Sequence, residues 1–187
     1  TTGIGIGYRI NEKLRHKINI DYVIKDYTVT NTNTVSESIG NSSGENVSFL
    51  LRNSIFYNTL NSGYLPKNGQ QLNFTNFIET PTSSSNGFIK NILTVKNFKK
   101  FNKNIFSAQA RVGNIISLSN NDILTDDKFA LGGRWLRGFD AFGAGPRNSR
   151  TSYVGGNNII VTKFDFSREL SDNADFPILV NVFLAVA

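Results

Sequence analysis

The sequence predicts an all-β fold: an antiparallel transmembrane β-barrel segment of about eight strands, with one long loop folded inward. Three observations predict this fold. Apolar and polar side chains alternate along most of the chain, the alternating segments are long, and tight turns alternate with long polar connections. Because successive side chains of a strand point to opposite faces, the alternation gives each strand one apolar and one polar face. Strands of about 9–11 tilted residues cross a bilayer, whereas strands of globular proteins usually have about 5–6 residues.

The predicted strands follow one another along the chain, and most of them alternate regularly. Their apolar positions are Ile4, Ile6, Tyr8 and Ile10; Ile18, Ile20, Tyr22 and Ile24; Val47, Phe49, Leu51, Ile55 and Tyr57; Phe106, Ala108, Ala110, Val112 and Ile116; Ile160, Phe164 and Phe166; and Ile178, Val180, Val182, Leu184 and Val186. Residues 70–80 and 87–100 supply two further strands, in which the alternation is less regular. Gly3, Gly5 and Gly7 lack the spacing of a dinucleotide-binding loop, so we expect them to leave space on the polar face of the first strand.

The connections between these strands also alternate in length. The segments "NEKL" (11–14) and "KKFNK" (99–103) predict tight turns, whereas residues 29–45 and 119–154 form long polar loops. Short turns at one rim and long loops at the other are typical of an outer-membrane barrel. A soluble antiparallel β-sandwich, in which one face of each sheet is exposed to solvent, would explain the alternation equally well. It accounts less well for the strand length and for the alternating loop lengths.

Composition excludes several classes of function. The chain has 187 residues and no cysteine, which excludes disulfides, thiolate metal sites and cysteine nucleophiles. His16 is the only histidine and cannot build a metal site alone. Residues 40–44 match the pattern G-x-S-x-G, but a nucleophile elbow needs a strand-to-helix turn and a positioned histidine, so we interpret them as a polar loop. We therefore expect a protein that is not an enzyme and that holds neither a metal nor a cofactor.

The net charge of +6 invites a nucleic-acid or anionic-membrane interpretation. The lysines and arginines are dispersed, however, and the aromatic residues that cluster around Arg134 and Arg137 are Trp135, Phe139 and Phe142. Stacking of bases on aromatic side chains is therefore a poor explanation, and we expect no nucleic-acid partner. The chain begins at Thr1 without a signal-peptide pattern, so we expect that processing or truncation has removed the original start.

A glycine-rich stretch, "GGRWLRGFDAFGAGPR" at 132–147, fits neither a helix nor a strand. Together with the later "YVGGNNIIVTKFDF", it resembles the C-terminal barrel of the bacterial surface antigen family, which includes BamA-type outer-membrane assembly factors. The core of the resemblance is Leu136, Arg137, Gly138 and Phe139, in the place of the family's hydrophobic-Arg-Gly-aromatic motif. Supporting positions are Gly132, Gly133, Gly145, Pro146, Arg147, Gly155, Gly156 and Asn157, and an upstream hairpin in which Pro66 and Gly69 introduce a strand ending near Glu79. The resemblance covers nearly the whole chain.

Arg137 is expected to need a partner, because a loop that folds back into a wide lumen carries this charge into a confined space. Asp165 shares the polar face with Lys163, whereas Phe164 and Phe166 face lipid. The resemblance also places the family's acidic partner at this position, with Asp where many relatives have Glu. We therefore predict an ion pair between Arg137 and Asp165 that pins the loop inside the barrel.

One position departs from the family pattern. The next strand usually contains Phe-x-Asp-x-Gly in the family, and the corresponding residues here are "FLAVA" at 183–187. Ala185 stands where the family has its second lumenal carboxylate. The departure predicts either a loop that is held less firmly than in relatives or terminal residues that are not native.

Eight strands cannot enclose a loop of this length by themselves. The interior of an eight-stranded barrel is just filled by side chains or by one small ligand, so either the loop at 119–154 lies outside the barrel or these strands belong to a wider wall. The family architecture has sixteen strands, and the motifs correspond to about the sixth to the thirteenth. The resemblance therefore implies that residues 1–187 are part of one outer-membrane β-barrel domain, with the terminal barrel strands and the periplasmic POTRA repeats outside this chain.

The function implied by the resemblance is that of an outer-membrane protein assembly factor, which assists the folding and insertion of β-barrel precursors without covalent chemistry. Its implied partners are the outer-membrane lipid bilayer, unfolded outer-membrane protein precursors and lipoproteins of an assembly complex, and its implied location is the bacterial outer membrane. Two alternatives stay open at this point. One is a protein-translocating or passive pore of the same family, and the other is a soluble β-sandwich binding protein.

Overall fold

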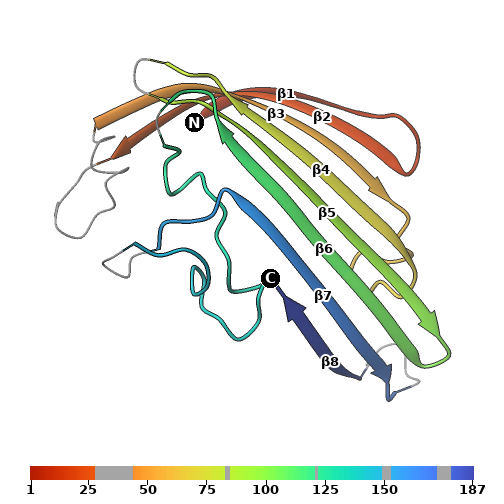
Figure 1. Cartoon of the computed structure of the whole chain (residues 1–187). Helices are drawn as coiled ribbons and strands as arrows, with labels where there is room; N and C mark the ends of the chain where they lie inside the picture. The colour runs from red at the N-terminus through yellow and green to blue at the C-terminus, as the bar shows by residue number, and fades with distance from the viewer. Residues whose placement is uncertain (28–43, 83–84, 121, 149–152, 172–177) are drawn as a thin grey trace.

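One antiparallel sheet makes up the described part of the protein. The computed structural model describes residues 1–27, 44–82, 85–120, 122–148, 153–171 and 178–187. Its strands pair in chain order: β1 (Thr2–Arg9), β2 (Leu14–Tyr27), β3 (Gly44–Asn58), β4 (Gly69–Glu79), β5 (Phe88–Phe101), β6 (Asn104–Ser117), β7 (Asn158–Glu169) and β8 (Leu179–Val186). Figure 1 shows that the sheet is strongly curved and does not close on itself, with β1 and β8 as its two edges. The prediction of an all-β segment of an antiparallel barrel is therefore confirmed.

Both predicted tight turns are present, but the connections at 59–68 and 80–87 do not follow the predicted alternation of length. The turn between β1 and β2 closes through a hydrogen bond of 3.0 Å from Ile10 N to Leu14 O, and Asn102 adopts a φ of 52° in the turn between β5 and β6. The connection between β6 and β7 covers residues 118–157 and starts at the opposite rim (Figure 1). The G-x-S-x-G match at 40–44 lies outside the described residues except for its last glycine.

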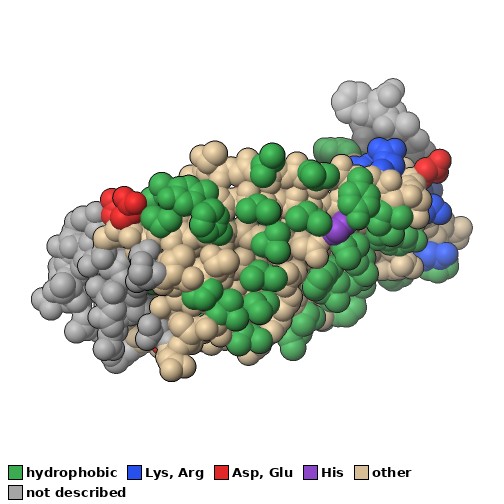
Figure 2. All heavy atoms as spheres, turned by 90° about the horizontal axis from the view of Figure 1, so that it is seen from above, with side chains coloured by type: hydrophobic (Ala, Val, Ile, Leu, Met, Phe, Trp, Pro, Cys, Tyr) green, Lys and Arg blue, Asp and Glu red, His purple; other side chains and the backbone are tan. Residues whose placement is uncertain are grey.

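The convex face of the sheet carries the predicted apolar side chains. The strand register places Ile4, Ile20, Leu51, Ile78, Ile89 and Ile116 in one row across β1 to β6. Ile20, Ile160 and Phe164 have exposed fractions of 52%, 66% and 52%, so no second sheet of the described chain covers them. Seen from above, the molecule presents many hydrophobic side chains, and the charged ones lie towards the two ends (Figure 2). The alternative of a soluble sandwich, which would bury these residues, is therefore wrong.

A row of asparagines crosses this apolar face. The register places Asn53, Asn76, Asn91, Asn114 and Asn158 side by side on β3 to β7. Asn76 Nδ2 donates to Asn91 Oδ1 at 2.7 Å, and Asn53 Oδ1 lies 2.6 Å from His16 Nε2. Polar groups that bond one another are less costly in an apolar environment than isolated ones. These contacts explain how Asn53, Asn76 and Asn91 are accommodated between hydrophobic neighbours.

The concave face is apolar at the rim where the connection between β6 and β7 begins. A buried cluster there consists of Phe88, Ile115, Ile123, Phe129, Ile159 and Val161. Ile123 and Phe129 come from the connection, and the other members come from β5, β6 and β7. The strands are therefore apolar on both faces at this rim, which explains why the alternation in 87–100 is irregular and why residues 159–161 form a continuous apolar run.

Candidate functional site

The connection between β6 and β7 folds back over the concave face of the sheet (Figure 1). Isolated bridges join its two arms at Phe129 and Gly156 and at Leu131 and Ala144, and a third bridge joins Arg147 to Tyr153 within the return arm. The described parts of this connection, at 118–120, 122–148 and 153–157, are named the internal loop below. The bridges give the internal loop the form of a long hairpin inside the curve of the sheet.

The predicted motif forms the tip of the internal loop. Gly133 N donates to Phe139 O at 2.9 Å, and Phe139 N donates to Leu136 O at 3.3 Å, so this segment closes into a compact turn. Gly132 has a φ of 135°, and a Cβ at this position would overlap the carbonyl oxygen of Asp140. The tip therefore requires glycine here, because other residues rarely adopt this conformation and have no room for a side chain.

Arg137 reaches from the tip to the wall of the sheet. Its Nη1 donates to Asp165 Oδ1 at 3.1 Å, and its guanidinium carbon lies 4.4 Å from the ring centre of Phe183 on β8. Ser107 Oγ donates to the other carboxylate oxygen of Asp165 at 3.3 Å. The Asp165 side chain is 10% exposed and the Arg137 side chain is 43% exposed. Arg137, Asp165 and Phe183 are named the tip anchor below.

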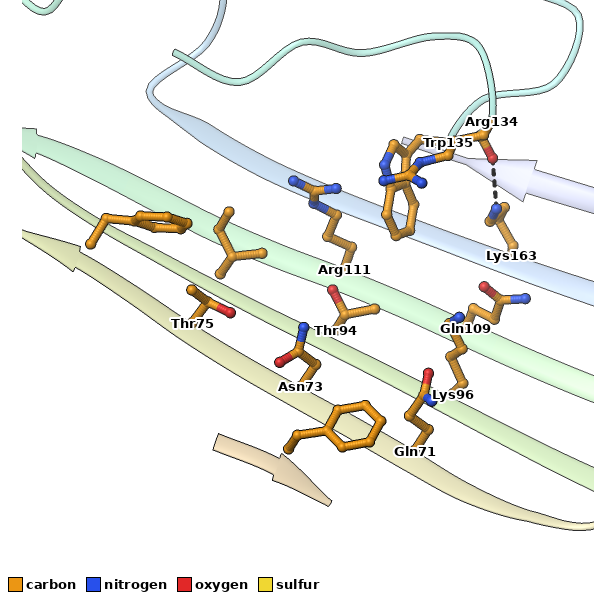
Figure 3. Close-up of a pocket in the computed structure, with 13 residues that line it drawn as sticks. Gln71, Asn73, Thr75, Thr94, Lys96, Gln109, Arg111, Arg134, Trp135 and Lys163 are labelled. Carbon is orange, nitrogen blue, oxygen red and sulfur yellow. Dashed lines mark hydrogen bonds between the residues drawn. The ribbon is translucent and has the colours of Figure 1, made fainter. Parts of the chain in front are cut away.

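Trp135 lies beside the tip anchor, among cations of the loop and the wall (Figure 3). Its ring centre is 4.5 Å from Arg111 Cζ, 5.0 Å from Lys163 Nζ and 5.5 Å from Arg134 Cζ. Lys163 Nζ also donates to the carbonyl oxygen of Arg134 at 2.7 Å. Cations over an indole ring are attracted by its negative face, which stabilises this arrangement. The sequence analysis did not single out Arg111, because an arginine on the polar face of a strand carries no signal of its own.

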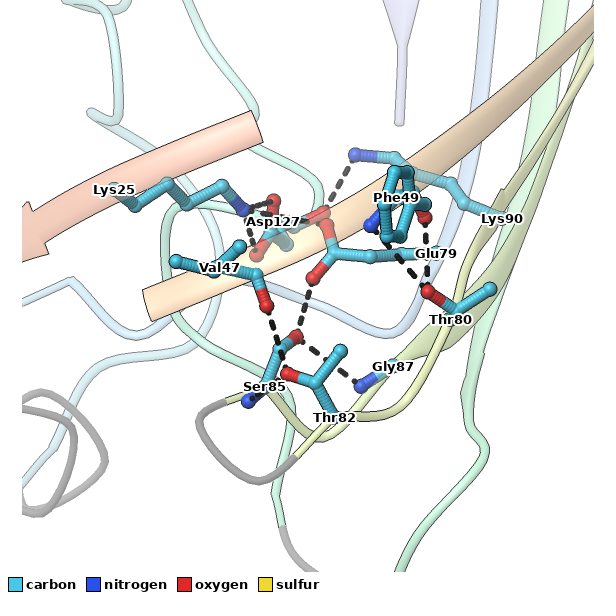
Figure 4. Close-up of polar contacts among 10 residues, drawn as sticks. All are labelled: Lys25, Val47, Phe49, Glu79, Thr80, Thr82, Ser85, Gly87, Lys90 and Asp127. Carbon is cyan, nitrogen blue, oxygen red and sulfur yellow. Dashed lines mark hydrogen bonds and ion pairs between the residues drawn. The ribbon is translucent and has the colours of Figure 1, made fainter. Parts of the chain in front are cut away.

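A second set of polar contacts holds the start of the internal loop (Figure 4). Lys25 Nζ lies 2.9 Å from both carboxylate oxygens of Asp127 and 3.5 Å from Glu79 Oε2. Lys90 Nζ donates to the carbonyl oxygen of Asp127 at 2.5 Å, and Ser85 Oγ donates to Glu79 Oε1 at 2.5 Å. The side chains of Lys25, Asp127 and Glu79 are 24%, 17% and 5% exposed. These contacts connect the loop to β2, β4 and β5.

Phe129 fixes the same part of the loop through apolar contact. Its ring occupies space left by Gly113 on β6, where a Cβ would come within 2.6 Å of the ring. Lys90 Nζ lies 4.7 Å from the ring centre. The hydroxyl of Tyr153 donates to the Phe129 carbonyl oxygen, and burial raises the pKa of Tyr153 above its ordinary value, which keeps the hydroxyl a neutral donor. Lys25, Glu79, Lys90, Asp127 and Phe129 are named the base anchor below.

The supporting glycines of the motif lie on the return arm of the loop. A Cβ at Gly145 would lie 3.6 Å from the ring of Tyr153. Gly156 exchanges two backbone hydrogen bonds with Phe129, at 2.9 and 3.0 Å, and Gly155 precedes it with a φ of 74°. These positions therefore align the return arm with the base anchor rather than with the tip.

The sequence analysis did not identify the base anchor. Lys25, Glu79 and Asp127 are far apart in the chain, and lone charges on strands or loops usually face water. One signal was available, because Gly113 interrupts β6 and an isolated glycine inside a strand indicates the close approach of another segment.

The described residues contain neither a metal-binding cluster nor a membrane-spanning helix. The described residues include no group of three or more His, Cys, Asp or Glu side chains that could bind a metal ion. They also include no helix that is long and apolar enough to span a bilayer.

The apolar convex face, the long strands and the loop inside the curve define a protein of the outer membrane that crosses it with β-strands. The model of the Omp85 superfamily domain matches residues 1–185, and the chain belongs to this superfamily. Its fold is similar to that of BamA from Haemophilus ducreyi, in a crystal structure lacking POTRA domains 1–3, with a TM-score of 0.80 and 18% sequence identity. The match covers 98% of this chain and 40% of that chain. None of the curated proteins matches the sequence.

Proposed function

We propose that the protein containing this chain assists the folding and insertion of β-barrel precursors into the outer membrane. The observation that carries the proposal is the internal loop, whose tip lies against the concave wall with Arg137 and Asp165 in contact at 3.1 Å. Membership of the Omp85 superfamily supports a role in the assembly or translocation of outer-membrane proteins. The similarity to BamA favours assembly.

We infer that residues 1–187 form part of a single outer-membrane barrel domain of about sixteen strands. In the described sheet, β1 and β8 each have a partner on one side only, and open sheet edges are not tolerated in hydrocarbon. The chain spans 40% of the BamA chain that it resembles. The inference therefore places the remaining barrel strands and the POTRA repeats outside this segment.

The proposed mechanism is conformational and contains no covalent step. The internal loop is held to β2, β4 and β5 at its base anchor and to β7 at its tip anchor. The loop thereby keeps this wall curved while precursor strands pair elsewhere on the barrel. The proposed partners are the lipid bilayer on the convex face, unfolded outer-membrane precursors and lipoproteins of an assembly complex.

The full-length protein reconstituted in lipid vesicles tests the proposal. A urea-unfolded β-barrel precursor is added, and its insertion is followed by its resistance to protease. We expect the wild type to accelerate insertion over empty vesicles and Arg137→Ala to remove most of that acceleration. Lys13→Ala, in the exposed turn between β1 and β2, is the control and keeps the wild-type rate. A wild-type rate equal to that of empty vesicles would contradict the proposal.

The same vesicles separate assembly from translocation. An unfolded passenger protein without barrel strands is offered in place of the precursor. Accumulation of the passenger inside the vesicles, without accelerated insertion of the barrel precursor, would identify a translocating pore and overturn the assembly proposal.

A further inference from the structure

A basic pocket lies between the tip of the internal loop and the concave wall (Figure 3). Its volume is about 440 Å³, and 13 residues from β3 to β7 and from the loop line it. Four of the lining residues are cations: Lys96, Arg111, Arg134 and Lys163. The lining contains no aspartate and no glutamate. Like charges gathered in a confined space repel one another and favour the entry of a negative charge.

The described chain does not neutralise these cations. None of its ion pairs includes Lys96, Arg111, Arg134 or Lys163. The Nε atom of Arg111 is buried and has no hydrogen-bond partner among the described residues. The neighbouring carboxylate of Asp165 already accepts from Arg137 and from Ser107. The pocket therefore has donors available to a ligand.

The pairing of β7 with β8 explains why Lys163 has no carboxylate beside it on the neighbouring strand. Ala185 is the direct cross-strand partner of Lys163, on the concave side of β8. A carboxylate at this position would lie beside Lys163 and supply a fixed counter-charge. The methyl group of Ala185 supplies none, so Asp165, which already pairs with Arg137, is the carboxylate whose charge acts on Lys163.

The uncharged part of the lining indicates what kind of anion fits. Gln71, Asn73, Thr75, Thr94 and Gln109 present amide and hydroxyl groups along the wall of the pocket (Figure 3). These groups donate and accept hydrogen bonds as a peptide backbone requires. A small inorganic anion would use the cations alone, whereas a peptide with acidic side chains would use both sets of groups.

We propose that this pocket binds an acidic polypeptide segment. Carboxylates of the segment pair with Arg111, Lys163 and Lys96, and its backbone bonds to the amides and hydroxyls of β4, β5 and β6. The site goes beyond the proposed function, because it depends on the lumenal wall and the loop tip and not on whether the barrel inserts or exports its clients.

Fluorescence of Trp135 in the full-length protein, held in detergent micelles at low salt, tests the site. The probe is the capped peptide tetraglutamate, with tetraglutamine and inorganic phosphate as comparisons, and Trp135→Phe identifies the signal of this indole. We expect saturable binding of tetraglutamate, no binding of tetraglutamine, and binding of phosphate at least 10-fold weaker. We also expect the affinity to fall as salt is raised, because surface and lumenal charges are screened.

Two sets of variants sharpen the test. Combined Arg111→Gln and Lys163→Gln should weaken tetraglutamate at least 10-fold. Ala185→Asp should weaken it similarly by supplying the fixed counter-charge, whereas Ala185→Asn should keep the wild-type affinity. If the double variant fails to fold, the two Ala185 variants provide the test, since position 185 is only partly buried. Equal binding of tetraglutamate and tetraglutamine, phosphate binding as tight as that of the peptide, or equal affinities of the two Ala185 variants would overturn the proposal.

Discussion

The base anchor and the tip anchor hold the same loop in different ways. At the base, the charged groups are mostly buried and adjoin an apolar cluster that contains Phe129. At the tip, the Arg137 side chain is 43% exposed and pairs with one carboxylate, that of Asp165, which is 10% exposed. Removing one member of a buried ion pair typically costs about 3–5 kcal/mol, whereas an exposed pair is worth about 0–1 kcal/mol. We therefore expect the base anchor to hold the loop on the wall more firmly than the tip anchor does.

We expect the base anchor to contribute mainly to stability and the tip anchor mainly to function. A contact that stabilises strongly is hard to change during a working cycle, whereas a weak contact can open and close again. The tip carries the motif at Leu136 to Phe139 and adjoins the basic pocket, so we expect its contacts to be the ones that change during function. The predictions below alter the two anchors in order of decreasing effect on stability.

The largest effect is expected from Phe129→Ala at the base anchor. The ring is 5% exposed and belongs to the buried cluster, so its removal should cost about 3–5 kcal/mol. Urea unfolding of the full-length protein measures the loss, and protease cleavage within the internal loop reports its detachment. Tyr64→Ala removes an aromatic ring that is 89% exposed and should leave both measurements unchanged. Equal unfolding free energies and equal rates of loop cleavage in the two variants would show that Phe129 does not hold the loop.

A smaller loss is expected from Asp127→Asn, which keeps the shape of the side chain and removes its charge. The variant weakens two contacts with Lys25, each of 2.9 Å, and should destabilise the protein by about 1.5–3 kcal/mol. Asp126→Asn is a matched control, because this adjacent carboxylate is exposed. A double-mutant cycle with Lys25→Gln measures the pair itself, and a coupling energy near zero would show that the pair contributes nothing.

Gly113→Ala alters the base anchor through the strand β6, which packs against Phe129 of the internal loop. Its Cβ would lie 2.6 Å from the ring of Phe129, so the ring must shift, at a cost of about 1–3 kcal/mol. Gly7→Ala, on β1, adds the same methyl group where the nearest atom is 3.6 Å away. Thermal unfolding of the two variants should differ by several degrees. A larger loss from Gly7→Ala than from Gly113→Ala would contradict the close approach of the loop.

The smallest change in stability is expected at the tip anchor. Arg137→Ala should cost about 0.2–1 kcal/mol, because the arginine is 43% exposed, even though the insertion assay should respond strongly. Exchange of the two charges, Arg137→Asp with Asp165→Arg, should restore part of the insertion rate lost by either single change. No recovery in the exchanged variant, with both singles folded, would show that the contact itself is not what matters.

The lipid-facing side of the fold was predictable from the sequence, and the side facing the loop was predictable only in part. The face towards lipid is mostly apolar, so Ile20, Ile160 and Phe164 alternate with polar neighbours and are exposed as expected. At the rim of the concave face, β5 to β7 pack against the internal loop instead of water. Alternation is lost there, because both faces of the strand are apolar.

In the candidate site, the contact at the tip anchor was predictable from the sequence, whereas the base anchor was not. Strand parity and the family motif brought Arg137 and Asp165 to one face, and the two side chains are 3.1 Å apart; their role in holding the loop stays a prediction. The base anchor has no comparable local pattern, because Lys25 and Asp127 meet only through the curvature of the sheet. Long-range pairs of this kind depend on tertiary structure and leave no periodic signal in the chain.

The central claim is that the internal loop lies inside the curve of the sheet, with its tip against β6 and β7. Photo-crosslinking tests it most directly, with benzoylphenylalanine in place of Gln109 in the full-length protein in membranes. Gln109 lines the same pocket as Arg134 and Trp135, so crosslinks should map by mass spectrometry to residues 132–137. The same probe in place of Ala110, one residue along β6, should react with lipid alone. Crosslinks from position 109 to lipid, or from position 110 to the loop, would contradict the account.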